Sequence, residues 1–206
     1  MRNTKSPLLR VLGLALMLLR LLGAQAAEET PQPGRWWAGI GLGYGQVLSS
    51  NGPARGDPNG VWLEMQLGMR VGRHLLTGFE LGGLGWQVSG ANYQPENHST
   101  SIYGQGITNQ FLVVQYAPQL ESGWFLGAAG GWVLYDNRGL EALSGNTRSG
   151  NGEAGLLRMG YDWRISRRGH FILDLNYEQG DIRLNAPFHG RFDTSLLSLG
   201  FRLSYH

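Results

Sequence analysis

The alternation of apolar and polar residues near the C-terminus is the feature that most constrains how this chain can fold. Between Ser195 and His206, apolar or aromatic residues occupy every second position. They are Leu197, Leu199, Phe201, Leu203 and Tyr205, and the positions between them hold Ser198, Gly200, Arg202 and Ser204. A period of two is the period of a β-strand, because successive side chains point to opposite faces. The sequence therefore predicts a final strand with one apolar and one polar face.

Seven segments upstream are predicted as strands on the same grounds. The eight predicted strands cover residues 36–46, 61–71, 75–88, 102–116, 123–135, 153–165, 170–179 and 195–206. Each has roughly the ten residues that a tilted strand needs to cross a bilayer. Gly82-Gly83 predicts a bend or bulge in the third strand. The orientation of the side chains stays open over 82–88 and over 102–116.

The connections between these segments alternate between long and short. Long polar stretches follow the first, third, fifth and seventh strands, whereas short turns such as 72–74 and 166–169 follow the second and sixth. This alternation predicts an all-β fold, an eight-stranded antiparallel up-and-down transmembrane β-barrel with short periplasmic turns and long extracellular loops. A soluble barrel of the lipocalin type is disfavoured, because the face opposite the apolar one holds glycine, serine and sparse ion pairs.

The N-terminus has the pattern of a secretory signal. Basic residues precede an apolar run over 11–19, and Ala24-Gln25-Ala26 is a small-x-small cleavage site. We predict a cleaved signal peptide at 1–26, a short periplasmic leader at 27–35 and the outer-membrane barrel at 36–206. The signal holds four of the 17 basic residues, which leaves 13 basic against 15 acidic ones. This acidic balance removes the basic footprint that nucleic-acid binding needs.

Aromatic residues are predicted near both ends of the strands. Trp36, Trp124, Trp163, Phe171 and Tyr205 fall beside short turns or a terminus, and Tyr44, Trp86, Trp132 and Tyr177 fall near the long loops. Two such girdles mark the two interfaces of a membrane. With these features the chain resembles the small eight-stranded outer-membrane proteins, namely the OmpA transmembrane domain, OmpX and the opacity-protein group. Members of that group usually end on an aromatic residue, whereas here His206 follows Tyr205.

The resemblance implies a monomer with a structural or surface-interaction role in the Gram-negative cell envelope. Envelope integrity, adhesion or defence would be served through the external loops. The implied partners are outer-membrane lipid and lipopolysaccharide, the barrel assembly machinery through the C-terminal strand, and a host or surface ligand. A lipid A-modifying enzyme (acyl hydrolase or transferase) and a narrow small-solute pore are the alternatives.

If the apolar faces contact lipid, the opposite faces place charged residues inside the barrel. The predicted interior network consists of Glu64, Arg70, Glu80, Arg158, Asp162, Arg164, Asp174, Glu178 and Arg202. An eight-stranded barrel is just wide enough for side chains to fill. Buried charges must be paired, so we expect interlocked ion pairs that form a polar core.

The long loops carry further candidate residues. Five arginines are candidate contacts to lipopolysaccharide phosphates or simply solvated loop charges: Arg55, Arg138, Arg148, Arg183 and Arg191. His98 and His189 lie in loops, the latter near Asp193 and Ser195, but sequence proximity is weak evidence for a catalytic triad. We predict no catalytic residue, no metal site and no cofactor.

Overall fold

The computed structural model describes residues 36–50, 59–87, 104–119, 122–138, 148–186 and 190–205. These residues form eight strands. The strands are β1 (Trp36–Ser50), β2 (Asn59–Val71), β3 (Leu75–Gln87), β4 (Gly104–Tyr116), β5 (Gly123–Arg138), β6 (Arg148–Arg164), β7 (Gly169–Leu184) and β8 (Gly190–Tyr205). Within these ranges no helix is long and apolar enough to span a membrane. The predicted signal peptide and leader lie outside the described residues.

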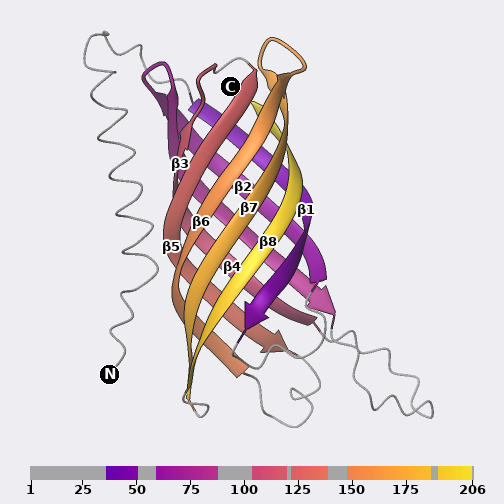
Figure 1. The fold of residues 1–206 in the computed structure, drawn as a ribbon, viewed down its shortest axis with the longest axis vertical. Coiled ribbons are helices and arrows are strands. Elements are labelled where there is room, and N and C mark those ends of the chain that lie inside the picture. The colour runs from indigo at the N-terminus through magenta and orange to yellow at the C-terminus, as the bar shows by residue number, and fades with distance from the viewer. Residues whose placement is uncertain are drawn as a thin grey trace, which may run out of the picture.

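The strands close into one antiparallel barrel in sequence order, as predicted. Each strand pairs with its neighbour, and β8 returns to pair with β1, with Ile40 opposite Leu203 and Gly41 opposite Arg202. Closure leaves no unpaired strand edge, which a bilayer could not satisfy with hydrogen bonds. In Figure 1 the turns between β2 and β3 and between β6 and β7 lie at the top, at the same end as the C-terminus.

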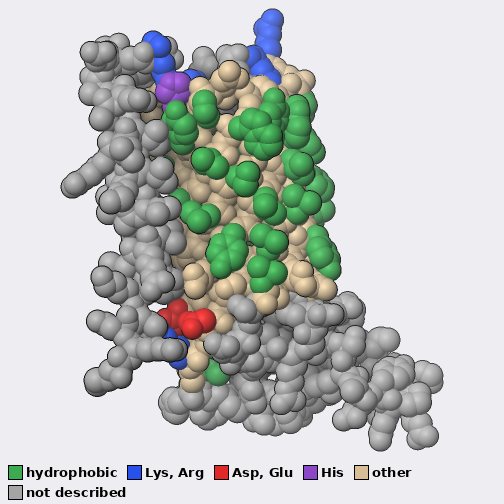
Figure 2. Space-filling view, in the orientation of Figure 1, with side chains coloured by type: hydrophobic (Ala, Val, Ile, Leu, Met, Phe, Trp, Pro, Cys, Tyr) green, Lys and Arg blue, Asp and Glu red, His purple; other side chains and the backbone are tan. Residues whose placement is uncertain are grey.

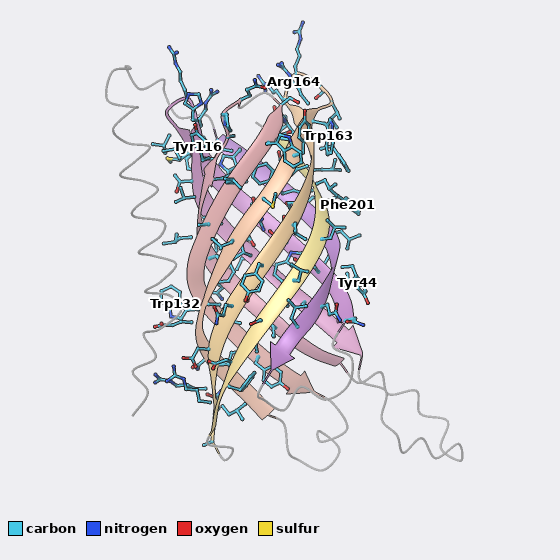
Figure 3. The ribbon with its side chains drawn as sticks, in the orientation of Figure 1. Tyr44, Tyr116, Trp132, Trp163, Arg164 and Phe201 are labelled. Carbon is cyan, nitrogen blue, oxygen red and sulfur yellow. The ribbon has the colours of Figure 1, made fainter. Side chains whose placement is uncertain are left out.

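The outer wall of the barrel is apolar between its two ends (Figure 2). Along β8 the side chains of Leu199, Phe201, Leu203 and Tyr205 are 54, 45, 52 and 54% exposed, whereas Arg202 between them is 1% exposed. Aromatic side chains lie toward both ends, with Trp163 and Tyr116 near the top and Trp132 and Tyr44 near the bottom in Figure 3. Side chains of this kind belong at the interfaces of a bilayer.

The predicted bend at Gly82-Gly83 is wrong. The pairing of β3 with β2 runs without a shift through Glu64 opposite Gly82 and Leu63 opposite Gly83. A side chain at Gly82 would put its Cβ 2.8 Å from the Asn109 Oδ1 atom. The glycine therefore makes room for an inward neighbour and does not mark a bulge. The one register shift recorded among the described pairings lies between Val47 and Ser49, where β1 pairs with β8.

The structure also settles the side-chain orientation of the fourth strand. Asn109, Phe111 and Val113 of β4 point into the barrel and are buried, whereas Leu112 is 69% exposed on the wall. The apolar run was ambiguous because both faces carry apolar residues, one toward lipid and one toward the core.

Several strands are longer than predicted at the long-loop end. The segments 148–152 and 180–184 were predicted as loop, yet β6 and β7 stay paired there, with Gly150 opposite Leu184. β8 likewise begins at Gly190. Backbone hydrogen bonds continue the ladder beyond the apolar wall, where side chains turn polar and the alternation of hydropathy ends.

The interior is divided into apolar and polar parts, whereas the sequence predicted a polar core. Toward the long-loop end a large buried cluster contains Val47, Trp62, Leu84, Ile107, Phe111, Val113, Ala129, Val133, Tyr135, Ala154, Leu156, Ile182, Phe192 and Leu196. At the short-turn end Ala117, Phe125 and Ile172 form a second cluster. The prediction failed because the faces were assigned from the alternation of apolar and polar residues. An apolar residue on the inward face breaks that alternation, so the sequence alone does not show that it points inward.

Met65 of β2 is 60% exposed on the outer wall, and this lipid-facing position can be tested directly. Met65→Arg places a charge near the middle of the wall and should destabilise the barrel by about 2–4 kcal/mol. Gln179→Arg, close to the long-loop end of the same wall, should cost about 0–1 kcal/mol. Equilibrium unfolding in lipid vesicles measures both. Equal costs for the two variants would contradict the assigned depth of Met65.

Candidate functional site

A buried ion-pair network lies between the two apolar clusters and is centred on Arg158 of β6. The guanidinium donates to Glu80 Oε2 at 2.9 Å and to Glu64 Oε2 at 2.7 Å. Its third nitrogen, Nε, donates to the Asn176 side-chain oxygen. The three partners come from β2, β3 and β7, so one side chain joins four strands across the barrel. Charge-assisted hydrogen bonds of this kind are about twice as strong as neutral ones.

Arg202 of β8 is the second guanidinium of the network. It donates to Glu64 Oε1 at 3.0 Å, and its other terminal nitrogen lies 3.5 Å from Asp174 Oδ2. Glu64 therefore bridges the two arginines through its two oxygens. Each of these side chains is at most 3% exposed. Because water is excluded, the ion pairs must replace the lost hydration of every charge.

Polar uncharged groups complete the coordination of the carboxylates. Gln66 donates to Glu80 Oε2 at 2.6 Å, Trp62 Nε1 donates to Glu64 Oε2 at 3.3 Å, and Asn176 donates to Asp174 Oδ1 at 2.9 Å. The sequence analysis missed these three residues. Their inward positions in the period-two pattern were the signal that could have found them.

Two further acidic residues face the interior outside the central network. Glu178 accepts a hydrogen bond of 2.6 Å from the Asn109 amide. Asp162 lies 2.9 Å from Nδ1 of His170 at the short-turn end. In the described network, the carboxylates of Glu64, Glu80 and Asp174 pair with two guanidiniums. Glu178 is hydrogen-bonded to an amide.

The structure buries seven of the nine residues predicted for the interior network and places the other two elsewhere. Arg70 and Arg164 occupy the inward side of their strands, but at the short-turn end. Arg70 donates to the Gly72 carbonyl at 3.1 Å, and Arg164 donates to the Ser166 and Arg167 carbonyls. Their side chains reach the rim because β2 and β6 end there. The prediction of an interior role for them is wrong.

A contact at the short-turn rim joins β8 to a neighbouring turn. Arg168 in the turn between β6 and β7 donates to the Tyr205 hydroxyl at 2.6 Å and lies over its ring. This hydrogen bond raises the pKa of the exposed guanidinium. The contact ties the last residue of β8 to the turn that precedes β7.

The candidate loop arginines are distributed differently from the prediction. Arg183 and Arg191 lie on β7 and β8, exposed on the outer wall, and Arg191 donates to both carboxylate oxygens of Asp181. Arg55, with His98 and His189, lies outside the described residues, as do the side chains of Arg138 and Arg148. In the described part of the chain no group of His, Asp or Glu could hold a metal ion.

The barrel is similar to several solved outer-membrane proteins. Neisserial surface protein A (NspA) matches with a TM-score of 0.51 and 14% identity, over 83% of this chain and 98% of that one. AlkL in DMPC bilayers gives 0.49 and 17%, over 86% and 92%. Ail of Yersinia pestis, in complex with the heparin analogue sucrose octasulfate, gives 0.45 and 11%, over 83% and 99%. No protein-family model and no curated protein matches the sequence.

A closed barrel with an apolar outer wall, aromatic residues toward both ends and a buried polar network defines an outer-membrane β-barrel. The likeness to NspA shows the same fold. The protein is built as the small eight-stranded outer-membrane proteins of the OmpA, OmpX and opacity-protein kind are. Its apolar outer wall and the aromatic residues toward both ends fit a membrane location, which the sequence predicted.

Removal of one guanidinium tests the network. Arg202→Leu leaves Glu64 and Asp174 short of a buried cation, and we expect a loss of about 3–5 kcal/mol of stability with the barrel retained. Arg167→Leu, in the exposed turn, should change stability by less than about 0.5 kcal/mol. Thermal unfolding in detergent, followed by gel mobility of heated samples, measures both. Identical transitions for Arg202→Leu and the parent would contradict a stabilising network.

The inward glycines of β1 make a second test possible. A Cβ at Gly41 would lie 2.7 Å from Glu64 Cγ and 2.9 Å from its Oε1. Gly41→Ala should therefore displace the carboxylate that bridges the two arginines, at a cost of about 1–3 kcal/mol. Gly85→Ala is the matched control, because its Cβ meets nothing within 4 Å. Equal unfolding temperatures for the two variants would show that the position of the Glu64 side chain does not depend on the space left by Gly41.

Proposed function

We propose that the protein is a non-conducting outer-membrane barrel whose role is structural or interactive at the cell surface. The barrel anchors and orients the long connections, through which envelope integrity, adhesion or defence is served. The observation that carries this proposal is the filled interior.

The order of inward side chains along β7 supports a closed interior. It runs from Ile172 through Asp174, Asn176 and Glu178 to Ile182, apolar at both ends and polar in between, and each of these residues is at most 3% exposed. Wide aromatic rings fill the apolar part, and Tyr135 packs edge-on against Phe192 at 5.3 Å. A solute would have to displace both a packed core and a paired charge network.

The described positions of the candidate triad residues give less support to an enzyme. Asp193 is an outward residue of β8 opposite Asp181, and Ser195 lies opposite Gln179 on the same wall. Neither residue lies in the buried polar network. These two residues therefore give no support to the lipid A-modifying alternative.

Planar-bilayer recording of the purified protein tests the closed interior. We expect no reproducible conductance steps at potentials where a porin in the same membrane opens. The double variant Trp62→Ala with Leu84→Ala removes two large buried side chains and serves as a control that an opened interior is detectable. Regular openings of the parent protein would overturn the proposal in favour of the pore.

The surface role has its own test in cells. Replacing segments 88–103 and 139–147 by short turns should leave the barrel heat-modifiable on gels but reduce adhesion to coated surfaces or survival in serum. A variant without the long segments that matched the parent in both assays would place the function in the wall and not in the loops.

A further inference from the structure

A pocket opens on the outer wall at the long-loop end of β5 to β8. Its volume is about 390 Å³, and its lining is Trp132, Asn151, Gly152, Glu153, Asp181, Arg183 and Arg191. Most of these side chains occupy outward positions of their strands, so the pocket faces the surroundings of the barrel and not its interior. In Figure 2 acidic and basic side chains meet at the lower left of the described wall, below the apolar surface.

The lining residues form two rows across neighbouring strands. Glu153, Asp181 and Asp193 lie opposite one another on β6, β7 and β8, with Trp132 continuing the row on β5. The next row toward the loops holds Asn151, Arg183 and Arg191. An acidic row thus borders the apolar wall, and a basic row lies beyond it.

The two arginines are unequal in their partners. Arg191 donates to both oxygens of Asp181. Arg183 stands directly opposite Arg191, and among the described residues no carboxylate lies within ion-pair distance of it. Like charges directly opposite on paired strands repel each other. An anion placed between the two guanidiniums would remove that repulsion.

The position of the pocket along the barrel axis indicates which kind of anion it can meet. Asp181 lies ten residues beyond Phe171 on β7, which for a strand tilted by about 40° is a rise of about 25 Å. Phe171 lies at the short-turn end of the apolar wall, so the pocket lies at the opposite, external interface. Trp132, 66% exposed beside the pocket, suits that interface.

We propose that this pocket binds the phosphate of a phosphorylated glycolipid of the outer leaflet, as in the lipid A part of lipopolysaccharide. Arg183 is the principal donor and Arg191, fixed in position by Asp181, is the second. Arginine matches this role because its planar guanidinium binds phosphate through two parallel hydrogen bonds. Trp132 offers an indole face to the sugar next to the phosphate.

Binding of lipid A to the purified full-length barrel tests the proposal. Native mass spectrometry in detergent gives the dissociation constant for bisphosphorylated lipid A. Arg183→Gln should weaken binding about tenfold or more, because it removes a charge-assisted contact. Arg183→Lys, which keeps the charge and loses the planar fork, should fall between the parent and Arg183→Gln. Arg167→Gln, an exposed arginine at the opposite rim, should bind as the parent does.

Four results would overturn the assignment. Unchanged affinity of Arg183→Gln would exclude the pocket, and an equal loss in Arg167→Gln would show general charge attraction. Equal binding of lipid A stripped of both phosphates would exclude the phosphate as the bound group. Phosphatidylglycerol is the last ligand to compare. If it binds as tightly as lipid A, and if Arg183→Gln weakens its binding equally, the ligand is a phospholipid headgroup and not a glycolipid. Gel mobility before and after heating confirms that every variant is folded.

Discussion

The small bore of an eight-stranded barrel is the constraint on which the rest of this structure depends. The interior must be filled by side chains alone, so a large inward residue on one strand requires a small one on its neighbour. β1 illustrates this requirement. Gly41 lies opposite Glu64 on one side and Arg202 on the other. The Glu64 side chain occupies the space that a side chain at Gly41 would need, and the Arg202 side chain occupies the corresponding space at Gly39.

The same constraint explains why the charges occur in the middle of the barrel. Buried charges are stable only where each finds partners, and a narrow barrel brings strands from opposite sides within reach of one long side chain. Arg158 of β6 reaches β2, β3 and β7. The apolar clusters above and below exclude water, which strengthens these bonds and also makes any unpaired member costly. The network therefore specifies closure, because its bonds form only when distant strands have come together.

Some features of the fold and of the buried network could be predicted from the sequence, because they appear in the alternation of residue types along the chain. Others depend on contacts between strands and could not. The strand alternation around Arg202 and the alternation of loop lengths predicted the barrel, because both arise from the bilayer itself. Phe111 was not predicted as interior packing, because an apolar residue in a run that is apolar on both faces can face either lipid or the core. Gly82 was mistaken for a bend because the reason for a glycine there is the nearby side chain of Asn109. That side chain belongs to another strand and cannot be placed from the sequence. Arg70 and Arg164 follow the alternation, but they lie where their strands end. The alternation gives the face of the strand on which a residue lies, and it does not show where the strand ends.

The change of side chains along β7 connects the fold to the charged pocket. Outward positions pass from Leu175 and Tyr177 to Gln179, Asp181 and Arg183 without any break in the strand. Arg183 therefore lies on a paired ladder that fixes its backbone on both sides, and not on a loop as the sequence suggested. A cation held on a strand has already lost most of the backbone freedom that a loop residue would lose on binding. That difference favours the wall of the barrel as the place where a phosphate is bound tightly.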